Sequence, residues 1–228
     1  MSAEPVIHED ALDRVRDGVF FTMPEALPRG RHKLTREQVL AAQRERLLAA
    51  VTELLAGRGY AGFGVGEVAG RAGVSLGTFY DCFAGKDACV FAGYDRFIEV
   101  LLKRIVAVDA PDEDRPALAQ ALIGAYLDTL AHDLVVARAY QVEIDALGPP
   151  ARARRREALT LFATNIRDRA ERRGGRGGPP ALAWSAYIGA VYAARQLASD
   201  ALDTADEPDL AALGAELAAW MSDLFRLR

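Results

Sequence analysis

A short stretch of small, polar and aromatic residues could contact the edges of DNA bases. Phe79 and Phe83 lie four residues apart and point to one side of a predicted helix, so they pack inward. Ser75, Thr78 and Tyr80 are left on the other side. Hydroxyl groups there can donate to or accept from groups in a DNA groove. The stretch therefore favours contact with nucleic acid.

Two short helices joined by a glycine turn position this stretch. Residues 65–72 are apolar at spacings of three and four, which is the helical period. Gly73 can take the left-handed conformation that ends a helix. Ser75 can then cap the next helix by accepting a hydrogen bond from the amide of Gly77 or Thr78. This pattern is typical of a helix-turn-helix that enters a major groove.

A third helix can cover the inner face of the pair. Thr35 and Gln38 form a capping box, which marks a helix start. The helix that follows carries leucine and valine on one stripe and ends near Gly57 or Gly59. Three helices then make a small DNA-binding unit.

The charge distribution agrees with phosphate binding on one face. The chain of 228 residues has a net charge of −4, yet residues 29–86 contain nine basic and five acidic residues. A basic segment on an acidic chain suits phosphate binding confined to one face. Residues 29–33 (RGRHK) are either an arm that follows phosphates or a solvated linker.

Residues 73–83 (GVSLGTFYDCF) and the Gly-Lys-Asp at 85–87 resemble the recognition-helix signature of the tetracycline-repressor (TetR) family of transcriptional regulators. The close resemblance covers about residues 34–95. It implies an all-α fold, with an N-terminal three-helix helix-turn-helix domain and a C-terminal helical ligand-binding and dimerisation domain. We expect an extension and basic arm at residues 1–34, a DNA-binding domain at 35–85 and a ligand-binding and dimerisation domain at 86–228.

The resemblance also implies which residues contact DNA. The phosphate contacts would come from Thr35, Arg36, Tyr80 and Lys86. The residues at the groove floor would be Ser75, Leu76, Gly77 and Thr78. A homodimer would place two recognition helices in successive major grooves, roughly 34–36 Å apart, and would read a near-palindromic operator in double-stranded DNA.

Apolar periodicity predicts further helices from Lys86 onward and over about residues 116–131, 134–146, 151–173, 181–202 and 209–226. The resemblance implies that this part binds a small-molecule effector, whose differential affinity for two states releases the protein from DNA. The polar or aromatic candidates for ligand contact are Tyr126, His132, Arg138, Tyr140, Glu143, Trp184 and Tyr187.

The last two predicted helices carry much apolar surface. A four-helix bundle shared by two chains would cover it, and burial within one chain is the alternative. The expected interface residues are Tyr187, Val191, Arg195, Leu213, Leu217, Trp220 and Leu224. Four arginines at 152, 154, 155 and 156 have acidic neighbours and are interpreted as a solvated face.

The N-terminal residues 1–28 have no role that the sequence indicates. Leu12, Val15 and Val19 fit one face of a short amphipathic helix at about residues 9–21. A loosely docked helix and a disordered arm both fit this pattern.

Other classes of protein fit less well. His8, His32 and His132 are scattered and show no metal-ligand spacing, so we expect no enzyme, metal or cofactor. No apolar run of membrane-spanning length and no signal peptide is found, which predicts a cytoplasmic protein that does not bind membranes. The favoured function is a repressor released by a ligand. The alternatives are a ligand-independent or activating regulator and a helical small-molecule-binding protein without DNA activity.

Overall fold

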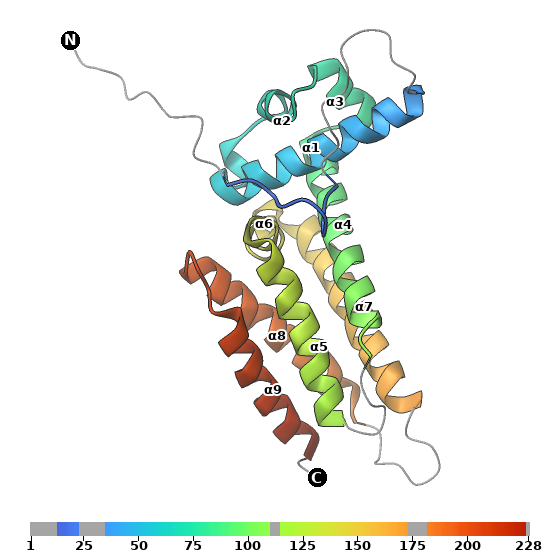
Figure 1. Cartoon of the computed structure of the whole chain (residues 1–228), viewed down its shortest axis with the longest axis vertical. Coiled ribbons are helices and arrows are strands. Elements are labelled where there is room, and N and C mark those ends of the chain that lie inside the picture. Colours follow the sequence, from blue (N-terminus) through green and yellow to red (C-terminus); the bar gives the residue numbers. More distant parts are fainter. Residues whose placement is uncertain (1–12, 23–34, 110–114, 173–181, 227–228) are drawn as a thin grey trace, which may run out of the picture.

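The computed structural model describes residues 13–22, 35–109, 115–172 and 182–226. These residues form two stacked groups of helices (Figure 1). Helices α1–α3, which we call the helix-turn-helix unit, form the upper group. Helices α5–α9, which we call the bundle, form the lower group, and α4 runs from one group into the other. The predicted all-α fold is confirmed for the described residues.

The helix-turn-helix unit follows the local signals in its sequence. Its elements are α1 (Arg36–Arg58), a 3-10 turn η1 (Tyr60–Gly62), α2 (Val65–Ala72) and α3 (Leu76–Cys82). The predicted capping box of α1 is confirmed, because the Thr35 side chain accepts from the Gln38 amide and the Gln38 side chain accepts from the Thr35 amide. At the start of α2, the Glu67 carboxylate accepts from the Gly64 amide at 2.7 Å.

The bundle differs from the prediction around residues 141–150. Its elements and the connecting helix are α4 (Lys86–Val106), α5 (Arg115–His132), α6 (Leu134–Gln141), η2 (Glu143–Leu147), α7 (Pro149–Arg172), α8 (Trp184–Thr204) and α9 (Leu210–Arg226). The helix expected over residues 134–146 stops at Gln141 and continues as a 3-10 helix. Pro149 and Pro150 begin α7, because residues in a first helical turn need no amide hydrogen.

The N-terminal helix expected over residues 9–21 is absent from its described part. Residues 13–16 have no regular secondary structure, Gly18 has a positive φ of 108°, and Asp17 pairs with Phe21 in an isolated bridge. The amides of Val15 and Arg16 donate to side chains far away in the sequence, so they are not available for a helix. The basic residues 29–33 and residues 1–12 lie outside the described residues.

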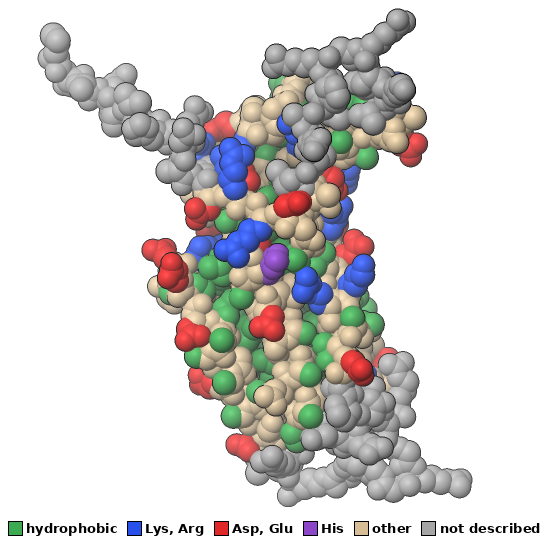
Figure 2. Space-filling model, viewed as in Figure 1, with side chains coloured by type: hydrophobic (Ala, Val, Ile, Leu, Met, Phe, Trp, Pro, Cys, Tyr) green, Lys and Arg blue, Asp and Glu red, His purple; other side chains and the backbone are tan. Residues whose placement is uncertain are grey.

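None of the described helices is long and apolar enough to cross a membrane. On the face shown in Figure 2, Lys and Arg side chains gather over the upper half and the middle of the protein. Asp and Glu side chains predominate lower down, between scattered hydrophobic ones. On this face the basic side chains therefore lie nearer to the helix-turn-helix unit than to the far end of the bundle.

Candidate DNA-binding surface and ligand cavity

The turn before α3 fixes the direction of that helix. Helix α2 ends at Gly73, whose φ of 65° and ψ of 36° are left-handed, and the Val74 amide donates to the Ala69 carbonyl. Ser75 caps α3, because its hydroxyl oxygen accepts from the Thr78 amide at 3.1 Å. The turn and the cap predicted from the sequence are confirmed.

The two sides of α3 differ in burial. Phe79 is fully buried and Phe83 nearly so, whereas Leu76 and Tyr80 are 50% and 55% exposed. Thr78 is half-buried on the outer side. Apolar and hydroxyl groups together suit a groove floor that presents thymine methyls and base edges. The other two predicted groove residues, Ser75 and Gly77, are also exposed.

The residues predicted to contact phosphates differ in their exposure and in the hydrogen bonds that they already make. Thr35 and Arg36 are exposed at the start of α1. Lys86 is partly buried, and its ammonium donates to the carbonyls of Tyr60 and Phe63 at 2.8 and 2.9 Å. It also lies 3.9 Å from the centre of the Tyr60 ring. Lys86 thus holds the η1 turn against α4 and has one N–H group left for a phosphate.

Arg44 and Glu53 of α1 hold the two helices of the motif. Arg44 donates to the Cys82 carbonyl at 3.0 Å, at the end of α3. Glu53 is buried, with 3% of its surface exposed, and its carboxylate forms an ion pair with Arg71 of α2. A buried carboxylate needs such a partner, because an unpaired charge in the interior is costly.

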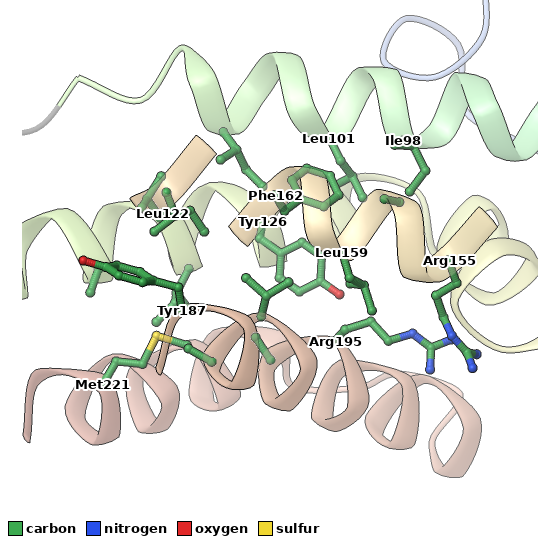
Figure 3. A pocket seen from close by; sticks show the side chains of 18 of the residues that line it. Ile98, Leu101, Leu122, Tyr126, Arg155, Leu159, Phe162, Tyr187, Arg195 and Met221 are labelled. Atoms are coloured by element: carbon green, nitrogen blue, oxygen red, sulfur yellow. The ribbon is translucent and has the colours of Figure 1, made fainter. Parts of the chain in front are cut away.

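The bundle contains an elongated, mostly apolar cavity (Figure 3). Its volume is about 120 Å³, on a scale on which one water molecule needs roughly 10–15 Å³. Side chains from α4 to α9 line it. Along α4 the lining runs from Tyr94 to Ile105, a helix length of about 16 Å. The elongated shape suits a narrow apolar chain, but the volume is below the roughly 150 Å³ of a cavity that holds benzene, so a long chain requires the helices to move apart.

Two arginines mark one end of the cavity. Arg155 of α7 and Arg195 of α8 lie there, opposite Tyr187 and Met221 (Figure 3). Arg155 forms an ion pair with Asp145, and Arg195 lies 3.5 Å from the same carboxylate. An anionic group of a ligand could take the place of this carboxylate.

The Tyr126 hydroxyl points into the cavity from α5, toward Arg195 (Figure 3). Its oxygen is buried and has no hydrogen-bond partner among the described residues. Burial raises the pKa of this phenol, and the Arg195 charge and the nearby Gln141 side chain partly oppose the effect. The phenol is therefore protonated, and no acceptor among the described residues meets hydrogen-bond geometry, although the Gln141 side chain lies near it. Leaving such a group unsatisfied costs about 1–3 kcal/mol, which a ligand acceptor would recover.

Three of the predicted ligand contacts, Tyr126, Tyr140 and Tyr187, line the cavity. Sequence reasoning missed the two arginines at its end. Arg155 was assigned to a solvated face and Arg195 to the dimer interface. Each arginine lies four residues from an apolar residue of the cavity lining on its own helix, and therefore on the same side of that helix. Arg155 comes four residues before Leu159, and Arg195 comes four residues after Val191. That spacing was a signal for an inward direction.

The other four predicted ligand contacts lie elsewhere. Arg138 and Glu143 border a separate polar pocket beside the end of α8, where Arg138 donates to the carbonyls of Leu202 and Ala205. His132 and Trp184 are exposed. None of the four lines the apolar cavity.

The residues predicted for a dimer interface divide between the surface and the interior. Trp220 is 43% exposed, and Val191 and Leu213 are half-buried. Tyr187 and Leu217 are buried within the chain, and Arg195 faces the cavity. The side chain of Leu224 lies outside the described part. The exposed face of α8 and α9 also includes Tyr192 and Leu197.

The cavity wall touches the helix-turn-helix unit directly. Tyr140 lines the cavity, and its hydroxyl lies 2.8 Å from the Thr52 hydroxyl of α1. The Tyr140 ring fits because residue 93 is glycine, since a Cβ there would lie 1.9 Å from the Tyr140 hydroxyl oxygen. A change in the cavity can therefore reach α1 through one side chain.

These features define a helix-turn-helix protein with an apolar cavity in a helical bundle. A sequence model of the bacterial regulatory proteins of the tetR family matches residues 47–92, from α1 into α4. The HTH-type transcriptional activator FasR of Mycolicibacterium smegmatis is 31% identical over 91 residues, which are 40% of this chain and 42% of FasR. The match thus spans about two fifths of the length of this curated relative.

Solved structures share the fold over most of the chain. The fatty acid degradation regulator FadR from Bacillus halodurans has a TM-score of 0.68 at 19% identity, over 82% of this chain and 97% of its own. FadR from Bacillus subtilis, solved in complex with stearoyl-CoA, has a TM-score of 0.61 at 23% identity, over 78% and 96%. Residues 47–92 thus match the DNA-binding region of the TetR family of bacterial regulatory proteins, and the fold over most of the chain is similar to that of these solved regulators.

Proposed function

We propose that this chain is a sequence-specific transcriptional regulator that binds DNA as a homodimer and responds to a long-chain acyl compound. The observation that carries the proposal is an exposed recognition helix in the same chain as an apolar cavity whose wall bonds to α1 through Tyr140. In this proposal residues 35–85 bind DNA, residues 86–228 bind the ligand and the second chain, and residues 1–34 form an extension.

The contacts with DNA follow from exposure and chemistry. Thr35, Arg36, Tyr80 and the remaining N–H group of Lys86 would bind phosphates, which position the protein. The outer side of α3, formed by Ser75, Leu76, Gly77 and Thr78, would contact base edges. Dimerisation through the exposed face of α8 and α9 would present two such helices to a near-palindromic operator in the cytoplasm.

The chemistry of the cavity favours an acyl compound as the effector. Its apolar length suits a hydrocarbon chain, and the buried Tyr126 hydroxyl suits a carbonyl oxygen. Arg155 and Arg195 suit an anionic part of the same molecule. FadR from Bacillus subtilis, which has a similar fold, was solved with stearoyl-CoA. We infer that stearoyl-CoA is a suitable first probe.

Release of a repressor from its operator is the favoured mode of regulation. The name of the relative FasR, an activator, supports activation as the second candidate. In both modes the ligand must bind two states of the protein with different affinity, which typically changes operator affinity by about 5–150-fold. No chemical reaction is part of this function.

A fluorescence-anisotropy titration tests the DNA-binding half. The duplex is the DNA immediately upstream of the protein's own gene, compared with a scrambled duplex at several salt concentrations. We expect tight binding that prefers the upstream DNA and falls steeply with salt. If binding to both duplexes is equally weak, the titration is repeated with sites selected from the whole genome. Weak binding to those sites as well would favour the alternative of a helical ligand-binding protein without DNA activity.

Calorimetric titration with stearoyl-CoA tests the ligand half. Tyr126→Phe should weaken binding about tenfold, because the ligand loses a hydrogen bond from a buried donor. Without ligand this variant should be nearly as stable as the parent, since its hydroxyl makes no hydrogen bond of normal geometry that could be lost. The matched control is Tyr192→Phe, which removes a hydroxyl from an exposed ring. Equal affinity of both variants and the parent would contradict the proposed contact.

A further inference from the structure

We propose that residues 13–22 form a clasp that couples the helix-turn-helix unit to the bundle and senses the cavity wall. Figure 1 shows this dark blue segment between the two groups of helices. The regulatory meaning of the clasp rests on the proposed function. The test below uses neither DNA nor ligand, so its outcome is independent of the titrations above.

Two successive amides of the segment bind two different groups of helices. The Val15 amide donates to the Glu53 carboxylate of α1 at 3.1 Å. The Arg16 amide donates to the Asp133 carboxylate, just before α6, at 2.6 Å. The Arg16 side chain also donates to the His132 carbonyl at 3.0 Å. A segment of two residues thus bridges α1 and the start of α6.

Both carboxylates are buried, and each also binds a group of another element: Glu53 binds a side chain of α2, and Asp133 binds the first amides of α6. Glu53 pairs with Arg71, so the bond from the clasp extends to α2 of the helix-turn-helix. Asp133 accepts from the amides of Val135 and Val136, which makes it the cap of α6. Bonds to charged groups in the interior are stronger than ordinary hydrogen bonds. The clasp therefore holds the elements that would have to move if the two groups changed orientation.

Aromatic packing joins the clasp to the cavity. Phe20 is buried, and its ring stacks on Phe97 of α4 with centroids 5.6 Å apart. Phe97 lines the cavity and also packs against Tyr140. A ligand that pushes the Phe97 ring away from the cavity would push it against Phe20, because the two rings are already in contact.

Arg96, the neighbour of Phe97, ties this contact to the helix-turn-helix unit. Its guanidinium donates to the Phe20 carbonyl at 3.4 Å and pairs with Glu45 of α1 at 2.7 Å. The clasp thus contacts α1 at two places, through Glu53 and through Arg96. A displaced clasp would loosen both.

Asp133→Asn is a selective test in the full chain. The asparagine oxygen can still cap α6, whereas its amide nitrogen would face the Arg16 amide, donor against donor. Asp209→Asn is the matched control, since Asp209 caps α9 through the Ala212 amide and lies outside the clasp. Phe20→Leu and Phe97→Leu remove the ring stack from its two sides and keep an apolar side chain.

Hydrogen exchange measured by mass spectrometry gives the readout. Loss of one charge-assisted bond should speed the exchange of amides in α1 and α2 about tenfold in Asp133→Asn, and Asp209→Asn should leave these amides unchanged. Phe20→Leu and Phe97→Leu should each speed exchange both in residues 13–22 and in α1. The double variant should add little, because both changes remove the same contact.

Three results would overturn the proposal. If exchange in Asp133→Asn rises only within residues 13–22 and α6, the segment is a passive covering rather than a clasp. If Phe97→Leu affects α4 and the bundle alone, the clasp does not sense the cavity wall. Additive effects of the two phenylalanine changes would lead to the same conclusion.

Discussion

Replacing Gly93 with alanine tests the closest contact between α4 and α6. An added Cβ would lie 1.9 Å from the Tyr140 hydroxyl oxygen and 2.9 Å from the adjacent ring carbon. The ring cannot easily move aside, because Tyr140 is fully buried and its hydroxyl is bonded to Thr52. Either the two helices separate or the bond to α1 breaks.

The size of the effect follows from two opposing contributions. Alanine in place of glycine inside a helix normally stabilises a protein by about 0.5–1 kcal/mol. Overpacking a filled interior costs about 1–3 kcal/mol, and loss of the bond between Tyr140 and Thr52 costs about 1 kcal/mol more. We therefore expect Gly93→Ala to lower the free energy of unfolding by about 1–3 kcal/mol. At this chain length, each kcal/mol lowers the Tm by roughly 2–4 °C.

Urea and thermal unfolding provide the assay, with Gly124→Ala as the control. No neighbouring atom lies within 4 Å of a Cβ added at Gly124 of α5, so this change should stabilise by about 0.5–1 kcal/mol. Adding Tyr140→Phe to Gly93→Ala removes the 1.9 Å contact and should recover part of the loss. If Gly93→Ala proves as stable as Gly124→Ala, the described packing of α4 on α6 is wrong.

Three further predictions concern the ion pair, the DNA contact and the dimer. Arg71→Met leaves the buried Glu53 carboxylate without its charged partner and should cost about 3–5 kcal/mol in urea unfolding; an unchanged midpoint would show that the pair is dispensable. Tyr80→Ala should weaken binding to operator and unrelated duplexes alike, because the ring would contact phosphate, and a loss on the operator alone would contradict that role. Trp220→Glu puts a charge on the exposed face of α9 and should give a monomer in sedimentation. A dimer that survives this change would rule out that face.

The local elements of the helix-turn-helix unit were predictable because their causes are short-range. The cap at Ser75 and the capping box at Thr35 each act within three residues, and the turn at Gly73 depends on one glycine. The residues that make these structures therefore lie side by side in the sequence. The end of α6 was less predictable, because the apolar spacing continues past Gln141 into a 3-10 helix. A 3-10 helix has about 3.0 residues per turn and an α-helix about 3.6, so the two patterns differ little over a few residues.

The N-terminal segment could not be predicted, because its partners lie far along the chain. Val15 and Val19 fit a helical stripe, yet the Val15 amide bonds to a residue 38 positions away and the Arg16 amide to one 117 positions away. A periodic pattern of three apolar residues is a weak preference. Two buried carboxylates that need donors outweigh it, since an unsatisfied buried charge costs more than a short helix gains.

The arginines at the cavity show what periodicity can and cannot decide. Successive residues on a helix are separated by about 100°, so a run of four arginines must point in several directions. Arg154 pairs with Asp95 at the surface, whereas Arg155 turns toward the cavity. Arg195 likewise shares the stripe of Val191, and the sequence identified that common side correctly. Whether such a side is covered by the same chain or by a second copy depends on where the other helices pack, and that information is absent from the spacing itself.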